Sequence, residues 1–449
     1  MYYDPTEYSS DSIAPRPPDS CAIAEVVRTH LDDFIRQVAD ESDRTLPSFA
    51  VRELRALGRC GDFLNGFVRL RCGSCRSDRI VPFTCQSRIC PSCVARRAAD
   101  TACWLVDRVL RPEIRWRQVV ITFPRALAVG LCFRASLADA VVRLCMRILF
   151  EHQRARASRD VVGIARPGGI VWIQRFSDGG GAWFHLHVLL PDGIFRELPD
   201  SLSVPFEPQP PPTNQEVHQL AATIARRATR LVTRHTDDGP DNPLLERCAS
   251  QPARRRGSAK PPSASPRRPH LLASVDGFSV HAATDVPPHQ TDALERLLRY
   301  FGRPPVPTGR VERQVDGNVV VNLKRARGSV ERFVFEPVAF LARLAALIPP
   351  PMHNLVRYYG VLAPGSPLRA DVLRPPAEST PTRPTAPARP ARMPWADLIL
   401  RVFVKDVLQC PCGGRLRVVA VITKPDVIEA FAAAITLCKQ SPARGPPPA

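Results

Sequence analysis

The segment 182–193 constrains the fold of this chain most strongly, because it places two histidines in a run that is otherwise largely apolar. Side chains alternate along a β-strand, so His185 and His187 face one way while Phe184 and Leu186 face the other. The apolar face can enter a core and leave both imidazoles lining a pocket. Two residues of strand separate the rings by roughly 6–7 Å, from which both can lean onto one divalent ion. The alternative is a pair of structural histidines that bind no metal.

The residues around this segment predict an antiparallel sheet. A strand at 170–176 and the strand at 183–190 flank a glycine-rich loop at 177–181, which is typical of a hairpin. Another strand is expected at 118–123, where Pro124 ends it. Helices are expected at 21–58, 98–110, 135–157, 290–301 and 338–347, and a second hairpin at 318–335. The predicted fold class is α+β, an antiparallel sheet with flanking helices that follows a small zinc-binding module.

Two Cys-x2-Cys pairs predict that module. Each pair supplies two thiolates from one tight turn, and two pairs complete the tetrahedron that Zn²⁺ accepts. We therefore expect one structural zinc ion with four ligands: Cys72, Cys75, Cys90 and Cys93. A site closed by four thiolates holds the fold and does no chemistry.

The other cysteines near such pairs are interpreted differently. Cys60 and Cys85 are more often buried apolar thiols than ligands. Cys410 and Cys412 form a Cys-x-Cys without a second pair in the sequence, since Cys438 stands alone, so we interpret them as a turn. The sequence leaves open whether any of these thiols binds metal.

The charge of the chain favours a polyanionic partner. Lysine and arginine total 62 against 43 acidic residues, a net charge of +19. Cationic surface gains affinity for nucleic acid through counterion release, so DNA is the expected partner. Four arginines surround the paired cysteines and either contact a DNA backbone or cover a solvated face: Arg79, Arg88, Arg96 and Arg97. No apolar run is long enough for a membrane span and no export signal opens the chain, which predicts a cytoplasmic protein without a membrane partner.

A tyrosine lies off the apolar stripe of the helix expected at 290–301. Leu294, Leu297, Leu298 and Phe301 share one helical face, and Tyr300 lies roughly 100° from its centre. Tyr300 is therefore not needed simply as a core aromatic. An exposed or half-buried tyrosine beside a helix end would be the default interpretation, but beside a paired-histidine strand Tyr300 suggests a more specific role.

Six ordered motifs between about 55 and 430 resemble one family. They are the cysteine module at 72–97, the strand at 119–124, the hairpin at 173–193, the helix end at 299–306, the segment at 349–364 and the start of a C-terminal unit at 395–398. Together they resemble the rolling-circle transposases of the insertion-sequence-ninety-one and common-region type, which carry the HUH endonuclease fold. Arg296 stands where some relatives have a second tyrosine, so the chain is similar to the single-tyrosine branch.

The resemblance implies a mechanism and a set of site residues. His185 and His187 would hold Mg²⁺ or Mn²⁺, and Tyr300 would attack single-stranded DNA at the element ends, leaving a 5′-phosphotyrosyl link that strand transfer reverses. Gln174 is the first candidate for a third metal ligand, because a hairpin centred on the glycine loop places it opposite His185. Glu295 is the second candidate, and a structural role remains open for both.

The implied organisation has four parts. A helical lead-in and zinc-binding domain is expected at 20–112, an HUH catalytic domain at 113–350, a connecting segment and linker at 351–394, and a small C-terminal unit at 395–440. Mobile insertions are expected near 200–215 and 237–270, which are rich in proline and polar residues. The alternatives to a nucleoid-associated bacterial transposase are a replication-initiator or relaxase-type nicking enzyme and an inactive DNA-binding protein. The oligomeric state is not predicted.

Overall fold

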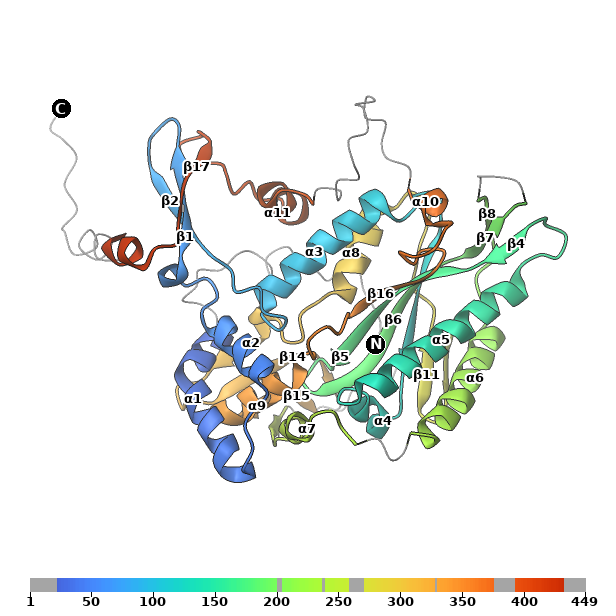
Figure 1. The fold of residues 1–449 in the computed structure, drawn as a ribbon, viewed down its shortest axis with the longest axis horizontal. Helices are drawn as coiled ribbons and strands as arrows, with labels where there is room; N and C mark the ends of the chain where they lie inside the picture. The colour runs from blue at the N-terminus through green and yellow to red at the C-terminus, as the bar shows by residue number, and fades with distance from the viewer. Residues whose placement is uncertain are drawn as a thin grey trace.

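The computed structural model describes residues 22–199, 204–235, 239–257, 270–327, 329–374 and 392–431. Its fold is α+β, with antiparallel sheets and flanking helices, as predicted. Figure 1 shows the largest sheet on one side of the molecule and a small separate sheet at the opposite end. None of the described helices combines the length and apolar character that a bilayer crossing requires.

The central sheet carries the paired histidines on an interior strand. Its strands follow the order β10 (Leu272–Val275), β11 (Phe278–His281), β3 (Trp116–Thr122), β6 (Ala182–Pro191), β5 (Gly168–Phe176) and β16 (Val356–Gly360), and β12 (Asp285–Val286) also pairs with β3. The β5–β6 pair is the predicted hairpin, and Gln174 pairs with His185 across it. Because both neighbours of β6 are strands, its backbone is fully paired and its side chains are fixed in direction.

Helices cover both faces of this sheet. One face packs in a core with α4 (Arg125–Gly130), α5 (Ala135–Arg156) and α6 (Asn214–Thr233). The other packs in a second core with α3 (Pro91–Arg108) and α8 (Thr291–Phe301). Figure 1 shows α3 and α8 side by side over the sheet. The sequence pattern predicted α3 only from residue 98, but Pro91 at its first turn lets the helix start directly after Cys90.

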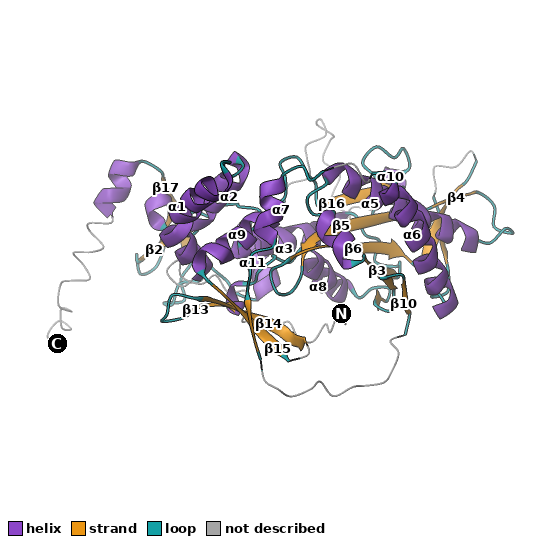
Figure 2. Cartoon of the chain, turned by 90° about the horizontal axis from the view of Figure 1, so that it is seen from below, coloured by secondary structure: helices purple, strands orange, loops and turns teal. Residues whose placement is uncertain are grey.

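The N-terminal helices pack beside a second sheet. Helices α1 (Ala22–Ser42) and α2 (Ser48–Gly58) pack with α9 (Pro337–Leu347), and η4 (Phe63–Asn65) follows α2. Next to them lies a sheet of β13 (Val311–Arg313), β14 (Val319–Arg327), β15 (Val330–Phe335) and β9 (Arg254–Arg256), preceded by η5 (Thr308–Arg310). Figure 2 shows this sheet below the helical layer. The hairpin expected at 318–335 is therefore confirmed.

Both expected insertions contain regular structure. The first includes β8 (Phe206–Pro208), which joins a small sheet with β4 (Ile164–Arg166) and β7 (Gly193–Glu197). Phe206 packs edge-on against Phe195 at 5.2 Å, and this contact anchors the proline-rich strand. The second includes α7 (Pro243–Ala249) and β9, while residues 258–269 lie outside the described residues.

A C-terminal strand joins the β1–β2 hairpin in a three-stranded sheet. Strand β17 (Leu416–Ile422) pairs antiparallel with β1 (Phe67–Cys72), which pairs with β2 (Asp78–Pro82). The short helix α10 (Arg369–Val372) and helix α11 (Trp395–Phe403) precede β17, and α11 packs against α3 through Leu398. Figure 1 shows this sheet projecting beside α11, at the end of the molecule opposite the largest sheet. Cys438 lies outside the described residues.

Candidate functional site

Strand β6 presents its two histidines to the face covered by α8. Phe184, Leu186 and Val188 are fully buried in the core on the opposite face, and Leu189 is buried in the core on the histidine side. The predicted alternation is therefore confirmed. The His185 and His187 ring centroids lie 5.1 Å apart.

Each imidazole is held by a contact at Nδ1. Nδ1 of His185 lies 3.2 Å from the carbonyl oxygen of Trp183, and only a protonated nitrogen donates to that acceptor. Nε2 of His185 therefore keeps its lone pair. Nδ1 of His187 lies 2.9 Å from the amide nitrogen Nε2 of Gln118 on β3, while Oε1 of Gln118 is buried without a hydrogen-bond partner among the described residues. In this orientation Nδ1 accepts from the amide; a half-turn of the amide would place Oε1 at Nδ1–H and put the lone pair of His187 on Nε2.

Burial keeps both imidazoles neutral. It lowers the pKa of His185 to about 3, and the nearby guanidinium of Arg303 adds to that effect. The pKa of His187 also lies well below its ordinary value because of burial, the neighbouring His185 and Arg303. Neutral imidazole is the form that binds metal ions. Nε2 of His187 is buried without a hydrogen-bond partner among the described residues, as a nitrogen reserved for an ion would be.

Gln174 lies beside the histidines and also contacts the tyrosine helix. Its Nε2 donates to the carbonyl oxygen of Phe301 at 2.7 Å. Its Oε1 is buried and has no hydrogen-bond partner in the described part of the chain. This oxygen and the Nε2 atoms of His185 and His187 are the candidate metal ligands: the amide oxygen is a donor that suits Mg²⁺ or Mn²⁺, and the imidazoles are donors that suit transition metals.

Glu295 takes a different position. Its carboxylate pairs with the Arg401 guanidinium on α11, with 2.8 Å between Nη2 and Oε2, rather than with the histidines. Within the described ranges, no Asp or Glu joins His185 and His187 in a metal-binding group. Of the two candidates for a third ligand, the structure therefore brings only Gln174 to the pair.

Tyr300 lies in the last turn of α8, against His187. The two ring centroids are 5.7 Å apart and their planes nearly perpendicular, at 87°. Phe301 and Trp172 fix this end of the helix, since Phe301 stacks on His187 at 5.2 Å and meets Trp172 at 5.0 Å. As predicted, the apolar stripe of α8 is buried, while Tyr300 is only half-buried.

Arg303 follows the helix and covers the tyrosine. Its guanidinium lies 4.3 Å from the centroid of the Tyr300 ring and 3.4 Å from a carboxylate oxygen of Asp178 in the glycine-rich loop. Nη1 of Arg303 is buried without a hydrogen-bond partner in the residues described. No sequence pattern singled out Gln118, and Arg303 appeared only as part of the helix-end motif at 299–306, because nothing local marks a side chain that acts across two elements.

The structure does not bring the two Cys-x2-Cys pairs together. The sulfurs fall into two groups, each with all ligand atoms within 4.8 Å of one another: a first cluster of Cys60, Cys85, Cys90 and Cys93, and a second cluster of Cys72, Cys75, Cys410 and Cys412. The β1–β2 hairpin separates the pairs. Phe67 pairs with Pro82 near the first cluster, and Cys72 lies five residues further along β1, roughly 17 Å away at the rise of an antiparallel strand.

The expectation of one zinc site with those four ligands is thus corrected, as are the interpretations of Cys60 and Cys85 as isolated thiols and of Cys410 and Cys412 as a simple turn. In the first cluster, sulfur–sulfur distances are 3.5 Å for Cys60–Cys90, 3.6 Å for Cys85–Cys93 and 3.8 Å for Cys60–Cys93. A tetrahedron with Zn–S bonds of about 2.3 Å has edges of about 3.8 Å. Both clusters therefore have the dimensions of a zinc site.

Two family models match the chain over these regions. Residues 26–123 match the family described as "Transposase zinc-binding domain" and residues 168–369 match the family described as "Putative transposase". The chain is a transposase of the insertion-sequence-ninety-one type. Comparison with curated proteins and with solved structures gave no match.

The two matched regions separate the cysteine clusters from the histidine strand. The zinc-binding domain includes the whole first cluster and half of the second, whereas Cys410 and Cys412 lie beyond both matched regions. The second match includes the histidine strand and Tyr300. A transposase acts on DNA, which agrees with the excess of basic residues.

Two of the arginines near the cysteines have structural roles in the transposase. The Arg88 guanidinium donates to the carbonyl oxygens of Pro350 and His353, each at 2.7 Å. Arg97 donates to the carbonyl oxygen of Ser87, also at 2.7 Å. Arg88 and Arg97 therefore hold loops in place, and Arg79 and Arg96 stay as candidates for DNA contact.

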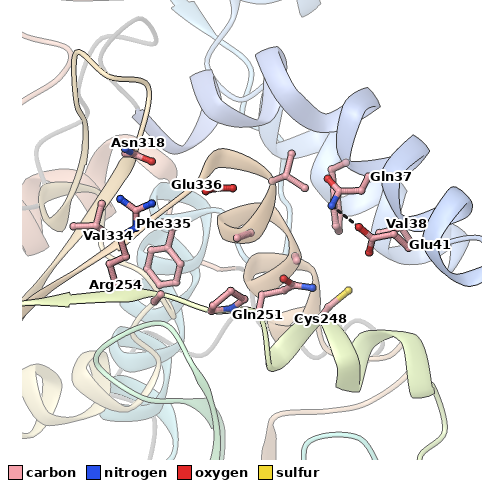
Figure 3. A pocket seen from close by; sticks show the side chains of 16 residues that line it. Gln37, Val38, Glu41, Cys248, Gln251, Arg254, Asn318, Val334, Phe335 and Glu336 are labelled. Carbon is pink, nitrogen blue, oxygen red and sulfur yellow. Dashed lines mark hydrogen bonds between the residues drawn. The ribbon is translucent and has the colours of Figure 1, made fainter.

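A cavity of about 260 Å³ lies away from the histidines, between α1, α7, α9 and β15. Figure 3 shows Gln37 and Glu41 of α1 on its rim, joined by a hydrogen bond of 2.6 Å. Its lining, as far as the structure describes it, does not include His185, His187 or Tyr300. This cavity is therefore separate from the candidate site on the sheet face under α8.

Proposed function

We propose that this transposase cleaves and rejoins single-stranded DNA at the ends of its mobile element, with Tyr300 as the nucleophile. The observation that carries the proposal is the contact between the rings of Tyr300 and His187, 5.7 Å apart on two different elements. The tyrosine is only half-buried, so a DNA strand can approach its hydroxyl group from outside.

The proposed metal ligands are His185 and His187 through Nε2, and Gln174 through Oε1. The support is the neutral state of both imidazoles and the unpartnered His187 Nε2 and Gln174 Oε1 among the described residues. When bound, Mg²⁺ or Mn²⁺ polarises the scissile phosphate and offsets the charge that develops on it.

Tyr300 performs the bond exchange. Its phenolic oxygen attacks phosphorus, the P–O3′ bond breaks, and the departing 3′ oxygen takes up a proton while the phenol loses one to solvent. The product is a 5′-phosphotyrosyl link and a free 3′-hydroxyl. Because the phenol has a pKa near 10, far below that of an alkanol, it can both attack and later leave. Attack by a 3′-hydroxyl reverses the step and transfers the strand, so rolling-circle transposition needs no ATP for joining.

Arg303 and Gln174 position the nucleophile. The Arg303 guanidinium lies over the Tyr300 ring, and Gln174 holds the backbone carbonyl of the next residue, Phe301. Nη1 of Arg303 is buried without a hydrogen-bond partner among the described residues, and a shift of this side chain would offer it as a donor to a phosphate oxygen close to the attacking group. The first cysteine cluster, including Cys90 and Cys93, is proposed to hold the zinc ion of the N-terminal domain, which fixes the start of α3 beneath α8.

A covalent-adduct assay tests this function. Purified full-length protein is mixed with Mn²⁺ and single-stranded oligonucleotides that span both flanks of its coding sequence, and adducts are detected on denaturing gels and located by mass spectrometry. Wild type should form a phosphotyrosyl adduct at Tyr300, and Tyr300→Phe should form none. Tyr358→Phe is the matched control, because Tyr358 lies on β16 and packs against Arg369 of α10 rather than against His187. An adduct in Tyr300→Phe would overturn the assignment.

A further inference from the structure

We propose that the second cluster, Cys72, Cys75, Cys410 and Cys412, binds a second zinc ion that joins the C-terminal segment to the zinc-binding domain. Neither matched family region includes Cys410 or Cys412. The inference therefore goes beyond the proposed cleavage activity and does not depend on it.

The distances within the second cluster fit a four-thiolate ion site. Sγ of Cys72 lies 3.6 Å from Sγ of Cys412, and Sγ of Cys75 lies 3.7 Å from Sγ of Cys410. These values match the edge of about 3.8 Å expected for four sulfurs around Zn²⁺. All four residues are free thiols, and both distances are well beyond the length of a disulfide bond.

Backbone groups build the two turns that present these thiols. The N–H group of Ser74 points at Sγ of Cys72 at 3.4 Å, just as the N–H group of Ser87 points at Sγ of Cys85 in the first cluster. On the other side, the N–H group of Cys410 donates to the carbonyl oxygen of Gly414 at 2.9 Å. The similar turn geometry indicates that the second cluster is built for the same purpose as the first.

Gly414 allows the two turns to approach each other. A Cβ atom at this position would lie 2.5 Å from Oγ of Ser74 and 2.8 Å from Sγ of Cys72, so any other residue here would force one of these side chains to move. Gly413, one residue earlier, has φ +84°, a conformation that favours glycine. The pair of glycines after Cys412 thus explains how a C-terminal turn closes over the tip of the β1–β2 hairpin.

The small sheet has little apolar core around the cysteines. The buried cluster there is Leu70, Cys72, Cys410 and Leu416, so two of its four members are cysteines, and Phe67 packs apart from it against Phe431. On the outer strand β17, the side chains of Val418 and Val421 are 62% and 60% exposed. Sheets with so little buried apolar surface are usually stabilised by a metal ion or a disulfide. A zinc ion supplies that stabilisation and holds β17 on β1.

The same C-terminal segment reaches the helix that carries Tyr300. Helix α11 contributes Arg401, whose guanidinium pairs with Glu295 on α8 and with Asp107 on α3, the latter with 2.7 Å between Nη1 and Oδ2. The carbonyl oxygen of Val402 accepts a bond from Arg299 of α8 at 3.4 Å. The second zinc ion thus anchors one end of a segment whose other end braces the tyrosine helix.

Metal content provides the first test. Full-length protein purified with zinc should contain about two metal equivalents per chain, one for each four-thiolate cluster. The Cys410→Ser/Cys412→Ser variant should contain about one and keep the other. Cys248→Ser is the matched control, because Cys248 is a buried thiol of α7 outside both clusters, and it should contain as much zinc as wild type. One equivalent in wild type, or two in the double variant, would overturn the proposal.

Thiol footprinting provides a test that needs no substitution. Cys75 and Cys412 are exposed, so burial cannot protect them from alkylation, whereas ligation can. In the purified protein both should react slowly with N-ethylmaleimide and become reactive when a chelator removes zinc, as mass spectrometry would show. The buried Cys145 should stay unreactive in the folded protein in either case. Rapid alkylation of Cys75 and Cys412 without chelator, or a Cys72–Cys412 disulfide, would contradict a metal site.

Discussion

The amide nitrogen of Gln118 lies 2.9 Å from Nδ1 of His187, so Nδ1 is occupied and Nε2 is the nitrogen left to face the proposed metal. A partner at the far nitrogen of a metal-binding histidine holds the ring orientation and the tautomer. The polar residue on β3 is thus as much a part of the site as the histidine on β6.

Replacing Gln118 should weaken divalent-ion binding. We expect Gln118→Leu to lower the affinity for Mn²⁺ by about 10- to 100-fold, because Nδ1 of His187 loses its partner. Gln118→Glu keeps an oxygen acceptor for Nδ1–H and should retain most of the affinity. Electron paramagnetic resonance titration with Mn²⁺ measures the difference. Equal affinity in Gln118→Leu would show that this contact does not support the site.

Matched substitutions of Gln174 and Glu295 test which of them is the third metal ligand. Gln174→Leu removes the unpartnered Oε1 and the bond to Phe301, so both Mn²⁺ affinity and adduct formation should fall. Glu295→Gln should leave Mn²⁺ affinity unchanged, because the Glu295 carboxylate faces Arg401. Calorimetric titration with Mn²⁺ gives both values. A loss of affinity in Glu295→Gln alone would reverse the assignment of the third ligand.

Arg303 should affect the rate of strand cleavage. Arg303→Met removes the cation over the Tyr300 ring and a donor near the scissile phosphate, and we expect a loss on the order of 10²-fold in the rate of adduct formation. Arg296→Met is the control, since Arg296 is an exposed arginine on the same helix. Single-turnover kinetics with labelled oligonucleotide measure both variants. Equal losses in the two variants would indicate a general effect of positive charge on DNA binding.

The buried ion pair between β3 and the end of β6 should be important for stability. Arg117 binds both carboxylate oxygens of Asp192, at 2.7 and 2.6 Å. Asp192→Ala leaves the buried guanidinium without that partner and should reduce the free energy of unfolding of this domain by about 3–5 kcal/mol. The double variant Arg117→Met/Asp192→Leu should lose less, because it leaves no buried charge. Urea denaturation followed by tryptophan fluorescence compares them, and a larger loss in the double variant would contradict this account.

Acid should destabilise the metal-free catalytic domain through the buried histidines. The pKa of His185 is about 3 in the folded chain and about 6.5 when unfolded, so below pH 6.5 only the unfolded state takes up the proton. The free energy of unfolding therefore falls with decreasing pH, by about 1.4 kcal/mol per unit for each such group, until the folded pKa is reached. His185→Asn should flatten this dependence between pH 7 and 5. Thermal unfolding without added divalent ions tests it, and parallel pH profiles for wild type and variant would refute it.

Local pattern was enough to predict the elements that carry the site. The two-residue alternation of β6 and the apolar stripe of α8 each depend only on neighbours within one element, so His185, His187 and Tyr300 could be singled out without knowledge of the fold. Gln174 lies opposite His185 as expected, although the loop closes one residue out of that register, with Phe176 opposite Ala182, and a strand irregularity between Gln174 and Phe176 makes up the difference. The same reasoning missed β16 and α6, whose surroundings are rich in proline and arginine.

The sequence by itself determined the kinds of side chains, their faces on each element and the presence of cysteine turns, because these follow from geometry over a few residues. Only the tertiary structure decided which partners meet. Cys72 and Cys75 join Cys410 and Cys412, and not Cys90 and Cys93, because the β1–β2 hairpin carries its tip away from α3 and β17 returns beside it. A contact between residues more than 330 positions apart leaves no local pattern, since it is fixed by the packing of the whole chain.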